Sequence, residues 1–281
     1  MVTSLLHLPS LRSGDSPMRR RSLLGLFALV STYRLLIGGL YVRHLDLIGD
    51  ERYYVRVAKR TGRFLKGRVT WDDALNIMTA RAWFMPGTGI HAMPAEYFTD
   101  RVDYVRMWMG VMDLGFLFVA TGLVARRFGR KFAAVFLLLI GLWPSTAVSS
   151  FTLWGESHGS LLLLISFLLL VEVSDKLDTW RPLTIALGAV GVGVILGWAV
   201  YLRPPFAVQL LAVVIVVIVT VFGRRGVSWG RAALLLLAIP AAIAVILPWS
   251  IAASDKVGGT VFTTVTFNVN LIHAFLSLIH I

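Results

Sequence analysis

Residues 206–222 read FAVQLLAVVIVVIVTVF, a stretch of the chain without a single charged side chain. An α-helix needs about 20 mainly apolar residues to cross the hydrocarbon core of a bilayer. The inner run, residues 210–221, lacks the alternation of apolar and polar side chains that a membrane β-strand requires. Because lipid offers the backbone no hydrogen-bond partner, this stretch is predicted to be a transmembrane helix.

Six further stretches share this character, so the sequence predicts an all-α polytopic membrane protein with about seven transmembrane helices. The predicted spans are residues 22–42, 104–125, 132–148, 157–173, 183–202, 206–222 and 232–252. Charged residues make up only 15% of the 281-residue chain, well below the roughly 25% of a soluble domain. The absence of cysteine excludes a disulfide scaffold and Cys-ligated zinc or iron–sulfur sites.

Basic residues predict the orientation, because cytoplasmic loops are enriched in Lys and Arg. If the N-terminal tail (1–21) is cytoplasmic, the inner segments hold thirteen basic residues, and the short outer ones hold only Arg203 and Lys256. The loop 43–103 holds ten, but loops of about 60 residues cross the membrane largely regardless of charge. The sequence therefore predicts a multi-pass plasma-membrane protein with its N-terminus inside, and its apolar composition argues against a nucleic-acid partner despite the net charge of +12.

The first extracytoplasmic loop, 43–103, is too long for a simple connector, and long loops usually carry function. At 100° per residue, residues 50–65 form an amphipathic helix. Its basic face holds Arg52, Arg56, Lys59, Arg60 and Arg63, and its apolar face holds Tyr53, Tyr54, Val57, Ala58, Phe64 and Leu65. Such a helix is expected to lie flat in the membrane interface, with its apolar face in lipid. Its basic face is either solvated or holds the phosphate of a lipid-linked substrate.

Asp50 and Glu51 stand where this helix begins. Asp50 suits a helix N-cap, and Glu51 would favour the helix dipole. Asp50 is also a carboxylate at the membrane–water boundary, able to take a proton from an acceptor hydroxyl. The two interpretations are compatible, since an N-cap position restrains a side chain.

Two other features of the predicted spans point to structure rather than chemistry. Asp113 and Arg34 lie at similar depths in the second and first spans. Ionisable groups inside a membrane are functional candidates, but a structural Arg34–Asp113 ion pair is the favoured prediction. Gly193 and Gly197 have the spacing of closely packed membrane helices.

Several short motifs follow one another along residues 20–275. They are Gly49-Asp50-Glu51 with Tyr54 after the first span, Met85-Pro86-Gly87, Arg106, Trp143-Pro144 leading to Glu156, Arg203-Pro204 and Pro248-Trp249. In their order and topology they resemble the GT-C superfamily of polyprenyl-phosphate-dependent glycosyltransferases. The protein O-mannosyltransferases and the aminoarabinose transferases of lipid A belong to this superfamily.

This resemblance implies a cell-envelope enzyme that moves a sugar, with inversion, from a polyprenyl-phosphate donor in the membrane lipid. The acceptor would be a protein, lipid or glycan on the extracytoplasmic face. Asp50 would be the general base, and a leaving phosphate would need cations nearby, which Arg203 or the loop arginines could supply. The candidate substrate-binding residues are Glu51, Tyr54, Arg106, Glu156, His158 and Arg203. No motif demands a cofactor, but a divalent metal stays possible, since some members of the superfamily use one.

Two other functions stay open at this point. A transporter or flippase for lipid-linked sugars would need access from both membrane faces, and a scaffold would need no chemistry. No inverted repeat, which many transporters have, is visible. Residues 270–281 are mainly apolar, and GT-C proteins usually have more spans. Residues 22–281 are therefore expected to be a GT-C-like transmembrane domain that is truncated at its C-terminus.

Overall fold

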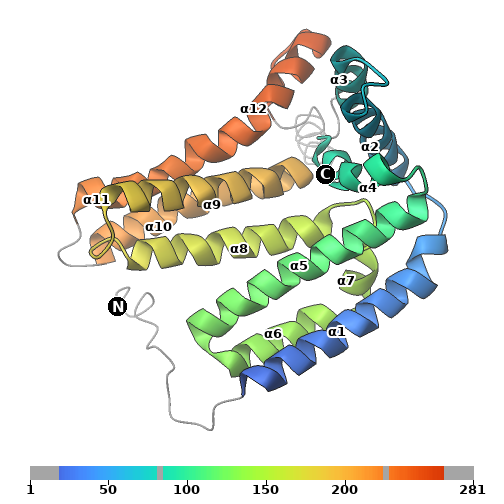
Figure 1. Ribbon diagram of the computed structural model, residues 1–281. Helices are drawn as coiled ribbons and strands as arrows, with labels where there is room; N and C mark the ends of the chain where they lie inside the picture. Colours follow the sequence, from blue (N-terminus) through green and yellow to red (C-terminus); the bar gives the residue numbers. More distant parts are fainter. Residues whose placement is uncertain (1–18, 81–84, 224–227, 263–281) are drawn as a thin grey trace, which may run out of the picture.

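The computed structural model describes residues 19–80, 85–223 and 228–262 (Figure 1). Most of the predicted tail, the basic residues Arg12, Arg81, Arg224 and Arg225, and the apolar stretch 270–281 lie outside the described residues. Within the described part every regular element is a helix, and six helical segments are long and apolar enough to cross a membrane. They are Arg20–His44, Val102–Phe128, Glu156–Asp175, Pro182–Leu202, Pro204–Phe222 and Trp229–Val257. The chain is therefore an all-α polytopic membrane protein, as predicted.

The count of seven spans is not confirmed, because the third predicted span is not one long helix. It is divided between α6 (Arg130–Leu142) and α7 (Pro144–Ser149). The residue before a proline is sterically disfavoured in helical conformation, and Trp143 is extended, with φ −63° and ψ 120°. The Trp143-Pro144 motif therefore breaks the segment near its end.

The remaining long helices lie side by side in Figure 1. α8 (Glu156–Asp175) packs between α5 (Val102–Phe128) and α9 (Pro182–Leu202). α1 (Arg20–Leu40) packs against α5 and α6, and α12 (Ala238–Val257) runs along α9. The connecting elements are η3 (Pro204–Gln209), α10 (Leu210–Gly223), α11 (Trp229–Ala233) and η4 (Leu234–Leu237).

The contact between α9 and α12 depends on two glycines, as predicted. A Cβ atom added at Gly193 would lie 2.3 Å from the carbonyl oxygen of Ala238. A Cβ added at Gly197 would lie 2.5 Å from the carbonyl oxygen of Ala242. Because these neighbours are backbone atoms, they cannot rotate away, and only glycine allows the two helices to approach so closely.

Replacing Gly197 by alanine is therefore expected to destabilise the fold by about 1–3 kcal/mol, the usual cost of overpacking. The measurement is the midpoint of thermal unfolding in detergent. Gly191→Ala is the matched control, because it lies on the same helix and its added Cβ would meet no atom within 4 Å. Equal midpoints for the two variants would contradict the packing role of Gly197.

The described part of the long loop contains three α-helices that gather at one end of the long helices (Figure 1). After η2 (Val42–His44) come α2 (Glu51–Leu65), α3 (Trp71–Thr79) and α4 (Gly87–Phe98). α2 packs mainly on α4, α3 contacts α2 and α12, and α4 contacts α5 and α9. The loop is therefore a small helical cap over the ends of the membrane helices.

The amphipathic helix is confirmed by α2, but its apolar face does not lie in lipid as predicted. Tyr53, Tyr54 and Val57 are at most 4% exposed and belong to a core shared with α3 and α4. Gly89 of α4 makes this close packing possible, since a Cβ there would lie 2.6 Å from Val57. The helix therefore buries its apolar face against its own protein.

The predicted Pro248-Trp249 motif joins this cap to the last span. The Trp249 indole Nε1 donates a hydrogen bond to the Met78 carbonyl oxygen at 3.1 Å. The Tyr53 hydroxyl donates to the same oxygen at 2.9 Å. One carbonyl near the end of α3 therefore holds both α2 and α12.

Candidate functional site

Glu51 is a buried carboxylate whose two oxygens are fully engaged. Oε2 accepts hydrogen bonds from the Ile48 backbone N–H at 3.1 Å and from Arg106 Nη2 at 2.8 Å. Oε1 accepts from the Leu153 backbone N–H at 3.0 Å. The Glu51 and Arg106 side chains are each 1% exposed. Glu51 therefore ties the start of α2 to α5 and to the segment before α8.

Arg106 holds the linker that leads into α2. Its guanidinium donates to the carbonyl oxygens of Val42 at 2.9 Å and of Asp46 at 3.0 Å, and also to that of Leu45. Because this side chain and that of Glu51 are buried and occupied, neither is open to a substrate in this structure. Both residues instead fix the position of Asp50, which follows the linker.

Asp50 stands at the N-cap of α2, partly exposed, but its side chain makes no capping hydrogen bond. Glu51 takes part of that role by reaching back to the Ile48 N–H. The negative charge of Asp50 acts instead on the Tyr54 hydroxyl and on the Arg203 guanidinium. The carboxylate is therefore not committed to the helix, and its charge acts on a cation from a distant segment.

Tyr54 lies one turn further along α2 and is 2% exposed. Burial raises the pKa of Tyr54 to about 12; the charge of Arg203 opposes this shift, and that of Asp50 adds to it. The hydroxyl therefore keeps its proton at neutral pH.

Arg203 and Glu156 form an ion pair across the ends of two spans. Glu156 is the first residue of α8, and Arg203 follows the last residue of α9 with extended backbone, φ −143° and ψ 101°. Burial lowers the pKa of Arg203, and the Tyr54 and Asp50 charges oppose that shift. The Arg203 and Glu156 side chains are 27% and 44% exposed, so a ligand can reach this pair.

Three segments meet at this point because small residues let their backbones approach. A Cβ added at Gly87 would lie 2.3 Å from the Tyr201 carbonyl oxygen. Gly155 has φ +75°, and a Cβ there would lie 2.5 Å from Thr88 Oγ1. The Thr88 hydroxyl also donates to the Leu202 carbonyl oxygen at 3.5 Å. The Met85-Pro86-Gly87 motif therefore places the start of α4 against the start of α8 and the end of α9.

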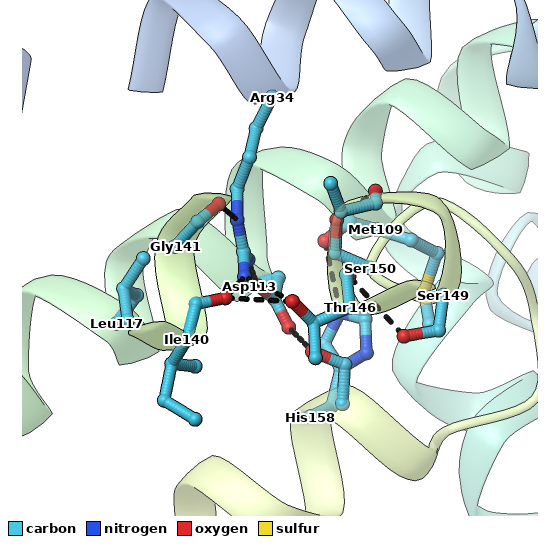
Figure 2. A network of polar contacts seen from close by, with 12 residues as sticks. Arg34, Met109, Asp113, Leu117, Ile140, Gly141, Thr146, Ser149, Ser150 and His158 are labelled. Carbon is cyan, nitrogen blue, oxygen red and sulfur yellow. Dashed lines mark hydrogen bonds and ion pairs between the residues drawn. The ribbon is translucent and has the colours of Figure 1, made fainter. Parts of the chain in front are cut away.

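The predicted ion pair between Arg34 and Asp113 is confirmed (Figure 2), and both side chains are 0% exposed. Arg34 also donates to the carbonyl oxygens of Gly141 at 3.0 Å and Ile140 at 2.7 Å. These carbonyls belong to the last turn of α6, where Pro144 prevents the helix from continuing. Arg34 therefore donates hydrogen bonds to carbonyl groups that the break in the third predicted span would otherwise leave unpaired.

The same network fixes the first turn of α8. The second oxygen of Asp113 accepts a hydrogen bond from the Ser157 hydroxyl. His158 Nε2 donates to the Met109 carbonyl oxygen at 2.9 Å, and Figure 2 shows His158 beside Met109. Together with the Glu156 ion pair, three consecutive side chains reach three different partners. The position of Glu156 is therefore determined by buried contacts behind it.

His158 is fully buried and is not placed where a substrate could reach it. Its ring packs against that of His91 from α4, with the ring centroids 5.2 Å apart. Burial lowers the pKa of His91 to about 3, and the nearby His158 adds to this shift. The contact of the two rings joins the loop cap to the membrane helices.

Sequence reasoning did not find Ser157, Thr88 or His91. Ser157 and Thr88 bond to partners 44 and 114 positions away. Serine and threonine are common at helix starts, so neither residue carries a local signal of such a contact. The position of Ser157 between Glu156 and His158 is the one hint that the sequence contains.

Within residues 19–80, 85–223 and 228–262, no three His, Asp or Glu side chains lie close enough together to hold a metal ion.

Comparisons with protein-family models, with curated proteins and with solved structures gave no match. The class of protein, a polytopic α-helical membrane protein, is defined by the fold alone. Its function is argued from the cluster of Asp50, Tyr54, Glu156 and Arg203, which we call the site cluster.

One helix of the loop cap, α4, carries a pH-dependent group, Glu96. Glu96 is 2% exposed, and both its carboxylate oxygens lack a hydrogen-bond partner. Burial raises the pKa of Glu96 to about 7; Lys59, Arg63 and Lys66 oppose the shift, and Asp100 adds to it. Since the folded state binds this proton more tightly, stability is highest below the ordinary value of 4.5 and falls as pH rises toward 7.

Glu96→Gln is therefore expected to raise the free energy of unfolding at pH of about 8 by roughly 1–3 kcal/mol. It should also remove the loss of stability between about pH 5 and 8. Thermal unfolding in detergent across that range measures both effects. Asp100→Asn, an exposed neighbour, should keep the pH dependence. An unchanged pH dependence in Glu96→Gln would show that this carboxylate is not its source.

Proposed function

We propose that the protein is a membrane glycosyltransferase of GT-C type, which moves a sugar from a polyprenyl-phosphate donor to a protein, lipid or glycan. Transfer would occur on the extracytoplasmic face of the plasma membrane. One observation carries the proposal. The negative charge of Asp50 acts on Arg203, and Arg203 pairs with Glu156 where the partly exposed ends of α8 and α9 meet. A base beside a cation suits the displacement of a phosphate leaving group.

In the proposed reaction the acceptor hydroxyl oxygen attacks the anomeric carbon from the face opposite the phosphate. A new glycosidic C–O bond forms, and the bond from the anomeric carbon to the phosphate oxygen breaks, so the configuration inverts. The electron pair of the broken bond leaves with polyprenyl phosphate, and Asp50 takes the hydroxyl proton. Arg203 stabilises the charge of the departing phosphate, which needs no proton from an acid.

The remaining residues of the site cluster hold these two groups in place. Glu156 engages one side of the Arg203 guanidinium, whose five N–H donors leave others for phosphate oxygens. Tyr54 lies near both Asp50 and Arg203 and, with its proton kept at neutral pH, adds a hydrogen-bond donor. Glu51 and Arg106 position the linker and do not contact substrate in this proposal.

The test is transfer by the purified full chain in liposomes that contain sugar-labelled polyprenyl phosphate and a panel of hydroxyl acceptors. We expect labelled product of inverted configuration, with one polyprenyl phosphate released for each sugar transferred. The alternative, a transporter or flippase, would move intact donor between leaflets without releasing polyprenyl phosphate. That result would overturn the transferase proposal.

A further inference from the structure

Basic side chains line the polar face of α2, opposite its buried apolar face. Five of them, which we call the basic strip, are Arg52, Arg56, Lys59, Arg60 and Arg63. Their spacing of three or four residues forms a row about 17 Å long at 1.5 Å per residue. None of the five takes part in an ion pair in the described part of the chain.

The basic strip has little internal compensation, since the acidic side chains whose charges it acts on are Glu96, near Lys59 and Arg63, and Asp73, near Arg60. Like charges three or four positions apart on a helix repel one another. Arg52 and Arg56 donate only to backbone carbonyl oxygens, those of Leu47 and Arg52. The one acidic residue on α2, Glu51, is buried and already paired with Arg106. An anionic partner would therefore stabilise this face of the helix.

The position of α2 indicates where that partner lies. A linker of ten residues joins the end of α1 at Leu40 to the start of α2, and three residues separate the end of α4 from α5. Both flanking helices are membrane spans. Figure 1 shows α2 lying across the ends of the long helices rather than along them. The helix is therefore held close to the bilayer surface.

Exposed aromatic side chains of α3 and α4, beside the end of α2, support a position at the bilayer surface. Phe98, Tyr97 and Trp71 are 84%, 39% and 50% exposed, although each is large and mainly apolar. Lys66 Nζ lies 5.2 Å from the centroid of the Tyr97 ring. Exposed aromatic residues beside basic ones are typical of the membrane–water interface, where rings and cations meet headgroups.

We propose that the basic strip binds the headgroups of anionic phospholipids on the α2 side of the bilayer. Because the apolar face of α2 is covered by α3 and α4, the contact is made by charge and not by insertion into the acyl chains. No residue of the basic strip belongs to the site cluster, and the proposal does not depend on sugar transfer. Lipid binding would hold α2, and with it Asp50, at a fixed depth.

The chain has no cysteine, so one can be introduced as a reporter. Leu65→Cys places a fluorophore at the exposed end of α2. The full chain is reconstituted in phosphatidylcholine nanodiscs that contain a nitroxide-labelled lipid, either phosphatidylglycerol or phosphatidylcholine. Each basic residue near an anionic surface favours binding by about fivefold. We therefore expect about threefold or more stronger quenching by labelled phosphatidylglycerol, declining as salt is added.

Neutralising the strip should abolish that excess quenching. The test variant combines Arg56→Gln, Lys59→Gln and Arg63→Gln, all outside the buried core. The matched control combines Arg20→Gln, Lys176→Gln and Arg181→Gln. These exposed residues lie at the ends of α1, α8 and α9 that are far from the loop cap, so the control should retain the excess quenching. Equal quenching by the two lipids, or an excess that survives in the strip variant, would overturn the proposal. Dextran sulfate, a soluble polyanion, is added in a separate measurement. A change in the reporter's fluorescence with dextran sulfate but with neither lipid would also overturn the proposal, because the strip would then bind a soluble polyanion.

Discussion

Replacing Asp50 by asparagine is expected to lower the rate of sugar transfer by about a hundredfold to ten-thousandfold, the usual contribution of a positioned general base. Asparagine has nearly the same shape but cannot take the proton of the acceptor hydroxyl. The fold should be unaffected, because the Asp50 side chain makes no capping hydrogen bond and is partly exposed. The change therefore separates chemistry from stability.

The initial rate of transfer and the midpoint of thermal unfolding are measured together for this variant. Asp46→Asn is the matched control, because Asp46 is an exposed carboxylate in the same linker. Its backbone oxygen, and not its side chain, contacts Arg106, so its replacement should leave the rate unchanged. Near-normal transfer by Asp50→Asn would refute the assignment of Asp50 as the base.

Replacing Asp113 by alanine is expected to cause the largest loss of stability, about 3–5 kcal/mol, because it leaves the Arg34 charge buried without a counter-charge. Both side chains are 0% exposed. The change also removes the acceptor of the Ser157 hydroxyl and so loosens the first turn of α8. A fall in transfer is expected to follow from the loss of Glu156 positioning.

Unfolding in mixed detergent micelles measures this loss, and two comparisons interpret it. Asp103→Ala breaks an exposed pair, in which Arg101 is 68% exposed, and should cost about 0–1 kcal/mol. Replacing both Arg34 and Asp113 by leucine removes both charges and should restore part of the stability. Recovery should be incomplete, because the Ile140 and Gly141 carbonyls also lose their donor. Equal losses for Asp113→Ala and Asp103→Ala would refute the buried-pair argument.

Local patterns in the sequence were sufficient for the long membrane helices and for α2, but not for the broken third segment or for α3 and α4. Long, mainly apolar runs identified six spans, because a backbone in lipid must bond within its own helix. The 3.6-residue period of the basic and apolar side chains identified α2. The depth of two charges within neighbouring spans was enough to pair Arg34 with Asp113, since lipid offers neither an alternative partner.

Only the tertiary structure decided which surfaces meet. The apolar face of α2 packs on α4 and not in lipid, and the sequence could not distinguish the two because both environments are apolar. Two adjacent carboxylates likewise have different environments. Glu51 is buried and paired with Arg106, whereas Asp50 is partly exposed and its charge acts on Arg203. Composition and periodicity thus determined an all-α membrane protein. The site cluster arose only where segments far apart in the sequence were brought together, because such pairing depends on packing that no local pattern records.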